Sequence, residues 1–190
     1  MAFELETDAE LPLADSIYCD SLLSIVAGDV LKALLEAGVA MEVALTRLLV
    51  DVSTTQPSSP AKASFIRKDG DRHPFGRKFS EWTEKLGLDP IGSFTFDGAP
   101  PKWHETALEL YKLRNGVAHG GQVGISSTFH EVVKAMFSAG ALLQYCRSQR
   151  EQLGLPVFSM PANISPWQQV MLCHDAHFSI ASGLITAVLA

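Results

Sequence analysis

The chain of 190 residues has only three cysteines, Cys19, Cys146 and Cys173, and they form no paired spacing. An odd number leaves one cysteine over, which argues against a disulfide framework and suits reduced thiols packed in a core. The N-terminal residues 1–14 are acidic where a signal peptide needs a basic region followed by an apolar run. Together these absences indicate a cytoplasmic protein.

The chain also lacks a long apolar run and an excess of basic residues. Its most apolar stretch, residues 178–190, contains Ser179, Ser182 and Gly183 and is shorter than the ~20 residues of a membrane span, so we expect no membrane association and interpret it as a core or dimer-interface helix. The net charge of −6 argues against indiscriminate nucleic-acid binding. RNA is still possible as a substrate, because a cleft can be locally basic in an acidic protein. The balance favours a selective or partner-delivered substrate.

Cofactor and metal motifs are missing as well. No P-loop, dinucleotide glycine pattern, nucleophile elbow or zinc ribbon is present. His174 and His177 have helical spacing, but no cysteine or carboxylate cluster completes a metal site around them. We therefore expect no cofactor and no metal.

What the chain does have is helical periodicity. With 47% hydrophobic residues it is long enough for one core. Apolar residues recur at three and four over about 15–27, 30–52, 75–86, 102–118 and 128–153, and residues 167–190 suit one more helix. We predict a loose acidic tail over 1–14 and a single all-α domain over 15–190. That domain is expected to be a compact antiparallel bundle of about five to six helices, with a flexible loop around 53–74.

The most informative segment is Arg114-Asn115-Gly116-Val117-Ala118-His119, at the end of a predicted helix and followed by Gly120 and Gly121. Arginine is shaped to hold a phosphate, and histidine exchanges a proton near neutral pH, so the pair suits metal-free chemistry on a phosphodiester. On a helix Asn115 shares a face with His119, with Lys112 a turn earlier, while Arg114 lies about 140° away. Arg114 and His119 converge only if the helix frays at the glycines or if a second copy lines the same cleft. The second route predicts a homodimer.

This segment resembles the R-N-x-x-x-H signature of the HEPN superfamily (higher eukaryotes and prokaryotes nucleotide-binding domain), over roughly residues 105–121. The resemblance implies a dimeric helical bundle that cleaves RNA without a metal, through attack by the ribose 2′-hydroxyl. His119 would be the general acid and base, and Arg114 would hold the scissile phosphate. Asn115 would orient the imidazole or the phosphate, and Gly120 and Gly121 would let RNA approach the backbone. Such proteins include toxins and antiphage defence factors.

Other interpretations stay open. The chain would also suit a non-catalytic HEPN-like module that binds a nucleotide or a partner protein, or an accessory protein whose enzyme lies in another subunit. The motif would also suit an ordinary helix end with a satisfied arginine. Glu42 stands amid an apolar stripe, where an unpaired carboxylate is costly, so it either pairs with the motif arginine or lies on an exposed helix back.

Overall fold

The computed structural model describes residues 12–55, 59–67, 70–95, 101–120 and 129–157. Its helices are α1 (Leu13–Val26), α2 (Val30–Thr55), α3 (Pro60–Arg67), α4 (Phe75–Arg77), α5 (Thr83–Lys85), α6 (Trp103–Gly120) and α7 (Phe129–Gln152), with short helical turns η1 (Gly70–Arg72), η2 (Lys78–Trp82) and η3 (Ile91–Ser93). These ranges contain no strand, which confirms the all-α prediction. The helix expected over 167–190, with its histidines, and residues 1–11 of the tail expected over 1–14 lie outside the described residues. The last two residues of that expected tail, Leu13 and Ala14, belong to α1.

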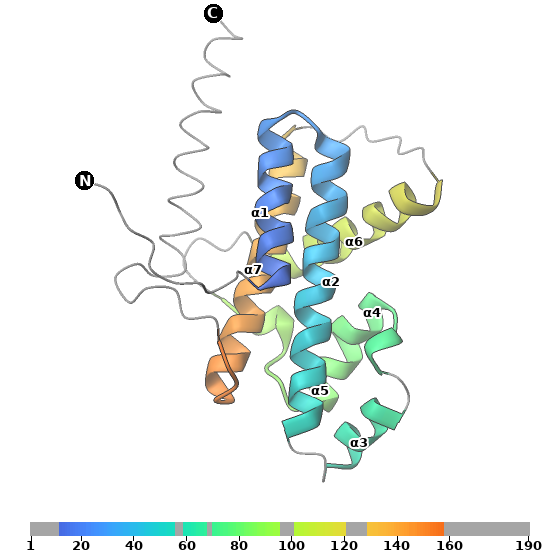
Figure 1. Ribbon diagram of the computed structural model, residues 1–190, viewed down its shortest axis with the longest axis vertical. Helices are drawn as coiled ribbons and strands as arrows, with labels where there is room; N and C mark the ends of the chain where they lie inside the picture. The colour runs from blue at the N-terminus through green and yellow to red at the C-terminus, as the bar shows by residue number, and fades with distance from the viewer. Residues whose placement is uncertain (1–11, 56–58, 68–69, 96–100, 121–128, 158–190) are drawn as a thin grey trace, which may run out of the picture.

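Helix α2 is the central element of the bundle, and α1, α3, α6, α7, η1 and η2 all pack against it (Figure 1). The predicted apolar stripe is the reason: Leu34, Ala37, Met41, Leu45, Leu48 and Leu49 are buried. Leu31 lies within the apolar-periodic range 30–52 but is exposed, because it lies in the first turn of α2 at the end of the bundle. None of the described helices combines the length and apolarity needed to cross a membrane.

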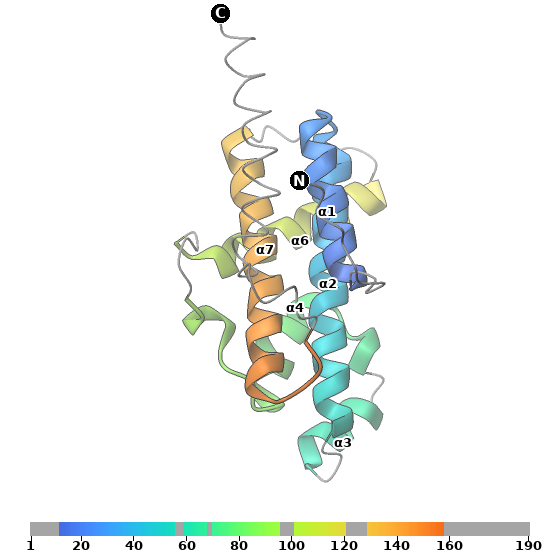
Figure 2. The same cartoon turned by 60° about the vertical axis from the view of Figure 1, so that its left-hand side comes forward.

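The bundle is not antiparallel throughout (Figure 2). Helix α1 runs antiparallel to α2 across a turn in which Gly28 has a φ of +81°. Helix α7 runs parallel to α2, since Asp51 near the end of α2 pairs with Arg150 near the end of α7. Between α2 and α7, the elements from α3 to α6 lead back toward the end of the bundle at which α7 begins (Figure 1). The prediction of an antiparallel bundle is therefore correct for α1 and wrong for the α2–α7 pair.

The loop expected around 53–74 is largely helical. Helix α2 continues to Thr55, and α3 begins with Pro60. Proline suits the first position of a helix, because the N–H that it lacks would have no partner within the helix. The Phe65 ring of α3 is buried and meets the Trp82 ring edge-on at 5.0 Å. Gly70 lies against the Phe65 ring, and a Cβ built on Gly70 would lie 2.3 Å from an atom of that ring. Burial of one aromatic side chain thus folds a segment whose polar composition suggested a loop.

The helix expected over 75–86 is present, but it contains the π-helical turn η2 between α4 and α5. A π turn adds one residue to a helical turn and so changes which side chains share a face. Lys78 is consequently directed inward and is only 2% exposed. The helix ends as predicted at Gly87, whose φ is +77°.

A polar clamp ties the segment before α6 to α7. The Asp89 N–H donates to Oε1 of Gln149 at 2.9 Å, and Nε2 of Gln149 donates to the Asp89 carboxylate at 2.9 Å. The Tyr145 hydroxyl donates to the Asp89 carbonyl at 2.7 Å. Further along, Nε1 of Trp103 donates to the Phe94 carbonyl at 3.1 Å, which sets the start of α6.

Substitution of Phe65 tests whether α3 is anchored in the core. We expect Phe65→Ala to lower the free energy of unfolding by about 3–5 kcal/mol, because it empties an aromatic core site. Its neighbour Ile66 is exposed, so Ile66→Ala serves as the control and should change stability by less than about 0.5 kcal/mol. Urea denaturation measures both. Equal losses in the two variants would show that α3 does not present Phe65 to the core.

Candidate functional site

The predicted motif helix is confirmed as α6, which is helical from Trp103 to Gly120. Its buried row consists of Trp103, Ala107 and Leu110, spaced by four and three residues. Arg114 follows Leu110 by four residues, so it takes the next place in the row that packs inward. At that place α6 meets α2.

A glycine on α2 makes room for Arg114. A Cβ built on Gly38 would lie 2.9 Å from Cβ and 2.8 Å from Cγ of Arg114, closer than a Cβ atom approaches a non-bonded carbon in proteins. Glycine is therefore required here for the close approach of the two helices, and the arginine stem lies over the α2 backbone. One turn further along α2, the guanidinium reaches Glu42.

Three groups hold the Arg114 guanidinium. Nη2 lies 3.3 Å from the Glu42 carboxylate, Nη1 donates to Oδ1 of Asn115 at 2.8 Å, and the central carbon lies 5.6 Å from the centre of the Tyr111 ring. The side chains of Arg114 and Glu42 are 22% and 29% exposed, so the pair is partly buried but open to solvent on one side. The predicted pairing of Glu42 with the motif arginine is confirmed. The Asn115 side chain accepts a hydrogen bond from the same arginine.

Helix α6 brings Arg114 and His119 no closer than a regular helix does. It stays helical through Gly120, so His119 lies about 140° around the axis from Arg114 and about 7.5 Å along it. The His119 side chain and Gly121 lie outside the described part of the chain, as do the surroundings of Gly120. Lys112 is exposed and pairs with Glu109 at 2.6 Å, separate from the Arg114 cluster.

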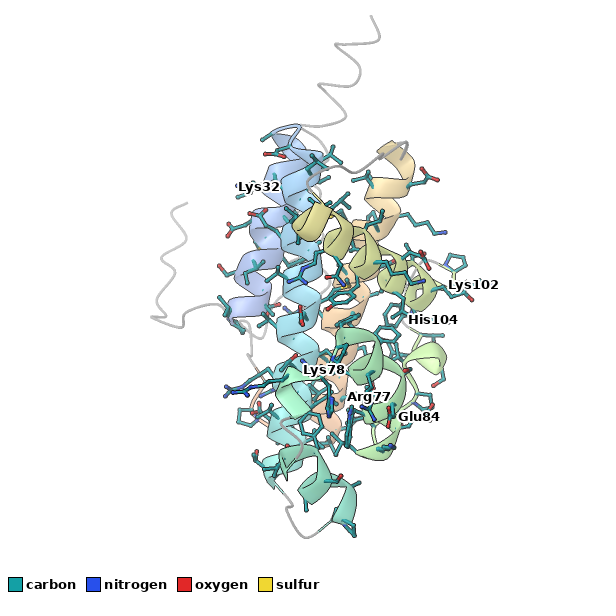
Figure 3. The ribbon with its side chains drawn as sticks, turned by 90° about the vertical axis from the view of Figure 1, so that its right-hand side faces the viewer. Lys32, Arg77, Lys78, Glu84, Lys102 and His104 are labelled. Atoms are coloured by element: carbon teal, nitrogen blue, oxygen red, sulfur yellow. The ribbon has the colours of Figure 1, made fainter. Side chains whose placement is uncertain are left out.

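Sequence reasoning missed a second cation near Glu42. A hollow of about 450 Å³ beside α2 is lined by Val39, Glu42, Val43, Thr46, Arg47, Val50 and Lys78. Nζ of Lys78 donates to the Thr46 hydroxyl at 2.8 Å, and Figure 3 shows Lys78 beside α2. Glu42 and Thr46 follow Gly38 at intervals of four, so they form one polar row on α2. The position of Lys78 depends on the π turn, for which the sequence carries no signal.

The two parts of this site are joined by aromatic stacking. The Phe75 ring stacks on Tyr111 with centres 4.4 Å apart, and Tyr111 in turn lies under the Arg114 guanidinium. This stack fixes the rotation and the position of the α4–α5 segment relative to α6. The arrangement can hold an anionic group next to an acid that orients the arginine.

Comparisons of the chain with protein-family models, with curated proteins and with solved structures find no match. Among the described residues, no three or more histidine, cysteine, aspartate or glutamate side chains gather in a way that could hold a metal ion.

Two helical glycines test the close approach of α2 and α6. We expect Gly38→Ala to destabilise the protein by about 1–3 kcal/mol, because the methyl group overlaps the Arg114 stem. Gly116 of α6 faces open space, so Gly116→Ala should stabilise the protein by about 0.5–1 kcal/mol through helix propensity. Thermal or urea unfolding measures the signs. Stabilisation by both substitutions would contradict the contact.

Proposed function

We propose that the chain is a HEPN-like, metal-independent endoribonuclease in which Arg114 binds the scissile phosphate and His119 transfers protons. The observation that carries the proposal is the fixed position of Arg114, held by Glu42, Asn115 and Tyr111 near the end of the helix that bears His119. The proposal includes a cytoplasmic location and a role as a toxin or an antiphage defence factor.

The reaction needs a cation, a general base and a general acid. The ribose 2′-oxygen attacks the phosphorus, and its proton passes to a neutral imidazole. The bond from phosphorus to the 5′-oxygen breaks, and an imidazolium gives that oxygen a proton. The products are a 2′,3′-cyclic phosphate and a 5′-hydroxyl. Arg114 stabilises the charge that builds on the phosphoryl oxygens, because its planar fork matches their geometry.

Glu42 prepares Arg114 for this role. A free arginine side chain has many rotamers, and fixing it on substrate binding has an entropic cost. The contacts to Glu42 and Asn115 use two edges of the guanidinium and hold its plane before the substrate arrives. Partial exposure of both side chains leaves the phosphate a route to the remaining N–H groups.

A two-fold homodimer completes the site in this proposal. On one helix the directions of Arg114 and His119 differ by about 140°, so a second α6 alongside the first supplies the missing face of the cleft. Leu113 and Val117 are spaced by four and are only half-buried, which leaves an apolar strip beside the motif. The two copies of His119 can then serve as base and acid.

A non-catalytic module that binds a nucleotide or a partner protein is the second candidate. The same Glu42 contact favours it, because Arg114 already has a carboxylate partner and could serve packing alone. The two candidates differ in whether bound RNA is cleaved.

Cleavage of single-stranded RNA in EDTA distinguishes them. We expect His119→Ala and Arg114→Ala each to reduce the rate by about 10²–10⁴-fold, and Arg114→Lys to be impaired because lysine lacks the fork. His104 is a half-buried histidine on the same helix, so His104→Ala is the matched control and should keep full activity. A His119→Ala variant that cleaves as fast as the unmodified protein would refute the catalytic proposal and favour the binding module.

The dimer is tested at the apolar strip. We expect the protein to scatter light as a dimer at micromolar concentration, and Val117→Asp to give a monomer that no longer cleaves RNA. Leu23 is exposed on α1, so Leu23→Asp is a control that should remain dimeric. A monomeric but fully active protein would remove the need for a shared cleft.

A further inference from the structure

A second hollow lies between α1, α2 and α7 and shares only Val43 and Arg47 with the hollow beside Glu42. Its volume is about 460 Å³, within the range of small-molecule pockets, ~300–1,000 Å³. It is lined by Pro12, Leu13, Ala14, Asp15, Val43, Ala44, Arg47, Leu143, Cys146, Arg147, Arg150, Pro156 and Val157. The lining combines apolar side chains with three arginines, Arg47, Arg147 and Arg150.

The apolar part of the lining comes from three helices. Leu13 of α1, Val43 and Ala44 of α2, and Leu143 of α7 supply hydrocarbon surface. Burial raises the pKa of the Cys146 thiol to about 12, so this side chain stays neutral at physiological pH. Because such walls exclude water, a charge held at their edge interacts more strongly than it does in bulk solvent.

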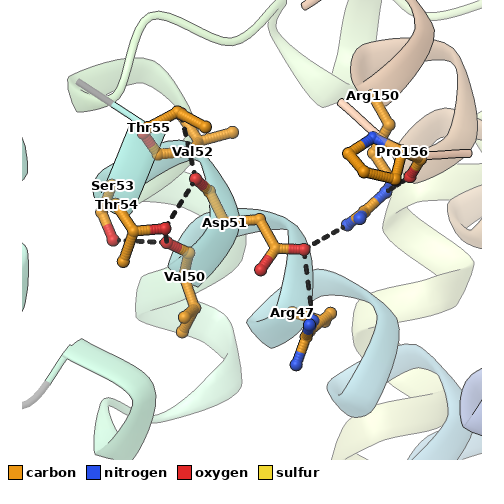
Figure 4. Close-up of polar contacts among 9 residues, drawn as sticks. All are labelled: Arg47, Val50, Asp51, Val52, Ser53, Thr54, Thr55, Arg150 and Pro156. Atoms are coloured by element: carbon orange, nitrogen blue, oxygen red, sulfur yellow. Dashed lines mark hydrogen bonds and ion pairs between the residues drawn. The ribbon is translucent and has the colours of Figure 1, made fainter. Parts of the chain in front are cut away.

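The three arginines share two carboxylates. Asp51 lies 3.2 Å from Nε of Arg47 and 2.8 Å from Nη1 of Arg150 (Figure 4). Arg147 pairs with Asp15 of α1. Within the described ranges this group therefore has one positive charge in excess, although the chain as a whole has a net charge of −6.

Arg47 is the side chain best placed to take a further anion. Its side chain is 73% exposed, and its contact with Asp51 is made through Nε. Arg147 and Arg150 are far less exposed, and Nε of Arg150 also donates to the Pro156 carbonyl at 2.9 Å. The terminal nitrogens of Arg47 make no contact with the described residues that would compete with a ligand.

We propose that this hollow binds a small molecule that carries one carboxylate on an apolar body. The carboxylate lies on Arg47 and balances the excess positive charge, and the body lies against Val43, Ala44 and Leu143. The contact of Asp51 with Arg47 and Arg150 already shows a carboxylate bound by these guanidinium groups. This site is separate from the proposed RNA chemistry, since Arg114 does not line it.

Isothermal titration with decanoate tests the proposal, and decan-1-ol is the probe with the same apolar body and no charge. We expect decanoate to bind saturably with one molecule per chain and decan-1-ol to bind at least about tenfold more weakly. Equal binding of the two probes would overturn the assignment of a carboxylate site. The absence of saturable decanoate binding would overturn the proposal as a whole.

Three variants locate the site. Arg47→Met should weaken decanoate binding at least about fivefold, and Asp51 keeps its contact with Arg150 in that variant. Arg77 is also exposed and in an i,i+4 pair, with Glu81, so Arg77→Met is the matched control and should bind as the unmodified protein does. Ala44→Trp should abolish binding by filling the hollow. Unchanged affinity in Arg47→Met, or a loss as large in Arg77→Met, would overturn the proposal.

Discussion

The contact of Arg114 with Gly38 is the constraint on which the candidate site depends. The arginine occupies a place in the inward-facing row of α6 that in most helices would carry an apolar residue. It is accommodated because α2 has no side chain at Gly38, so the aliphatic stem packs on backbone and the charged head emerges one turn later at Glu42. This contact brings the motif arginine directly onto α2.

The ion pair that results is better understood as an orienting device than as a source of stability. Partly exposed pairs contribute little to folding, typically ~0–1 kcal/mol, because desolvation and side-chain entropy offset the Coulomb attraction. Glu42 nevertheless restricts where the guanidinium lies, and Asn115 and Tyr111 restrict its plane. A group that must meet a phosphate benefits from this restriction, because less entropy is lost on binding.

One helix organises both hollows of the molecule. Gly38, Glu42 and Thr46 follow one another at intervals of four on α2, while Arg47 and Asp51 form a neighbouring row turned around the same axis. Arg47, and Val43 four residues before it in the second row, line both hollows. The first row meets α6 and the Lys78 turn, and the second meets α7, so two chemically different surfaces share one scaffold.

The sequence by itself determined the long helices α1, α2, α6 and α7 and the place of the motif, because apolar periodicity and glycine stops are local signals. It also indicated that Glu42 needs a partner, since a carboxylate in an apolar stripe is costly when unpaired. It did not reveal α3, whose helix depends on the burial of Phe65 under Trp82, or the inward turn of Lys78 in the π turn. The parallel course of α2 and α7, and the meeting of Arg47, Arg147 and Arg150 at one hollow, were decided by the tertiary structure alone. The physical reason is that periodicity shows which side of a helix is buried, whereas the identity of the partner depends on residues distant in the chain.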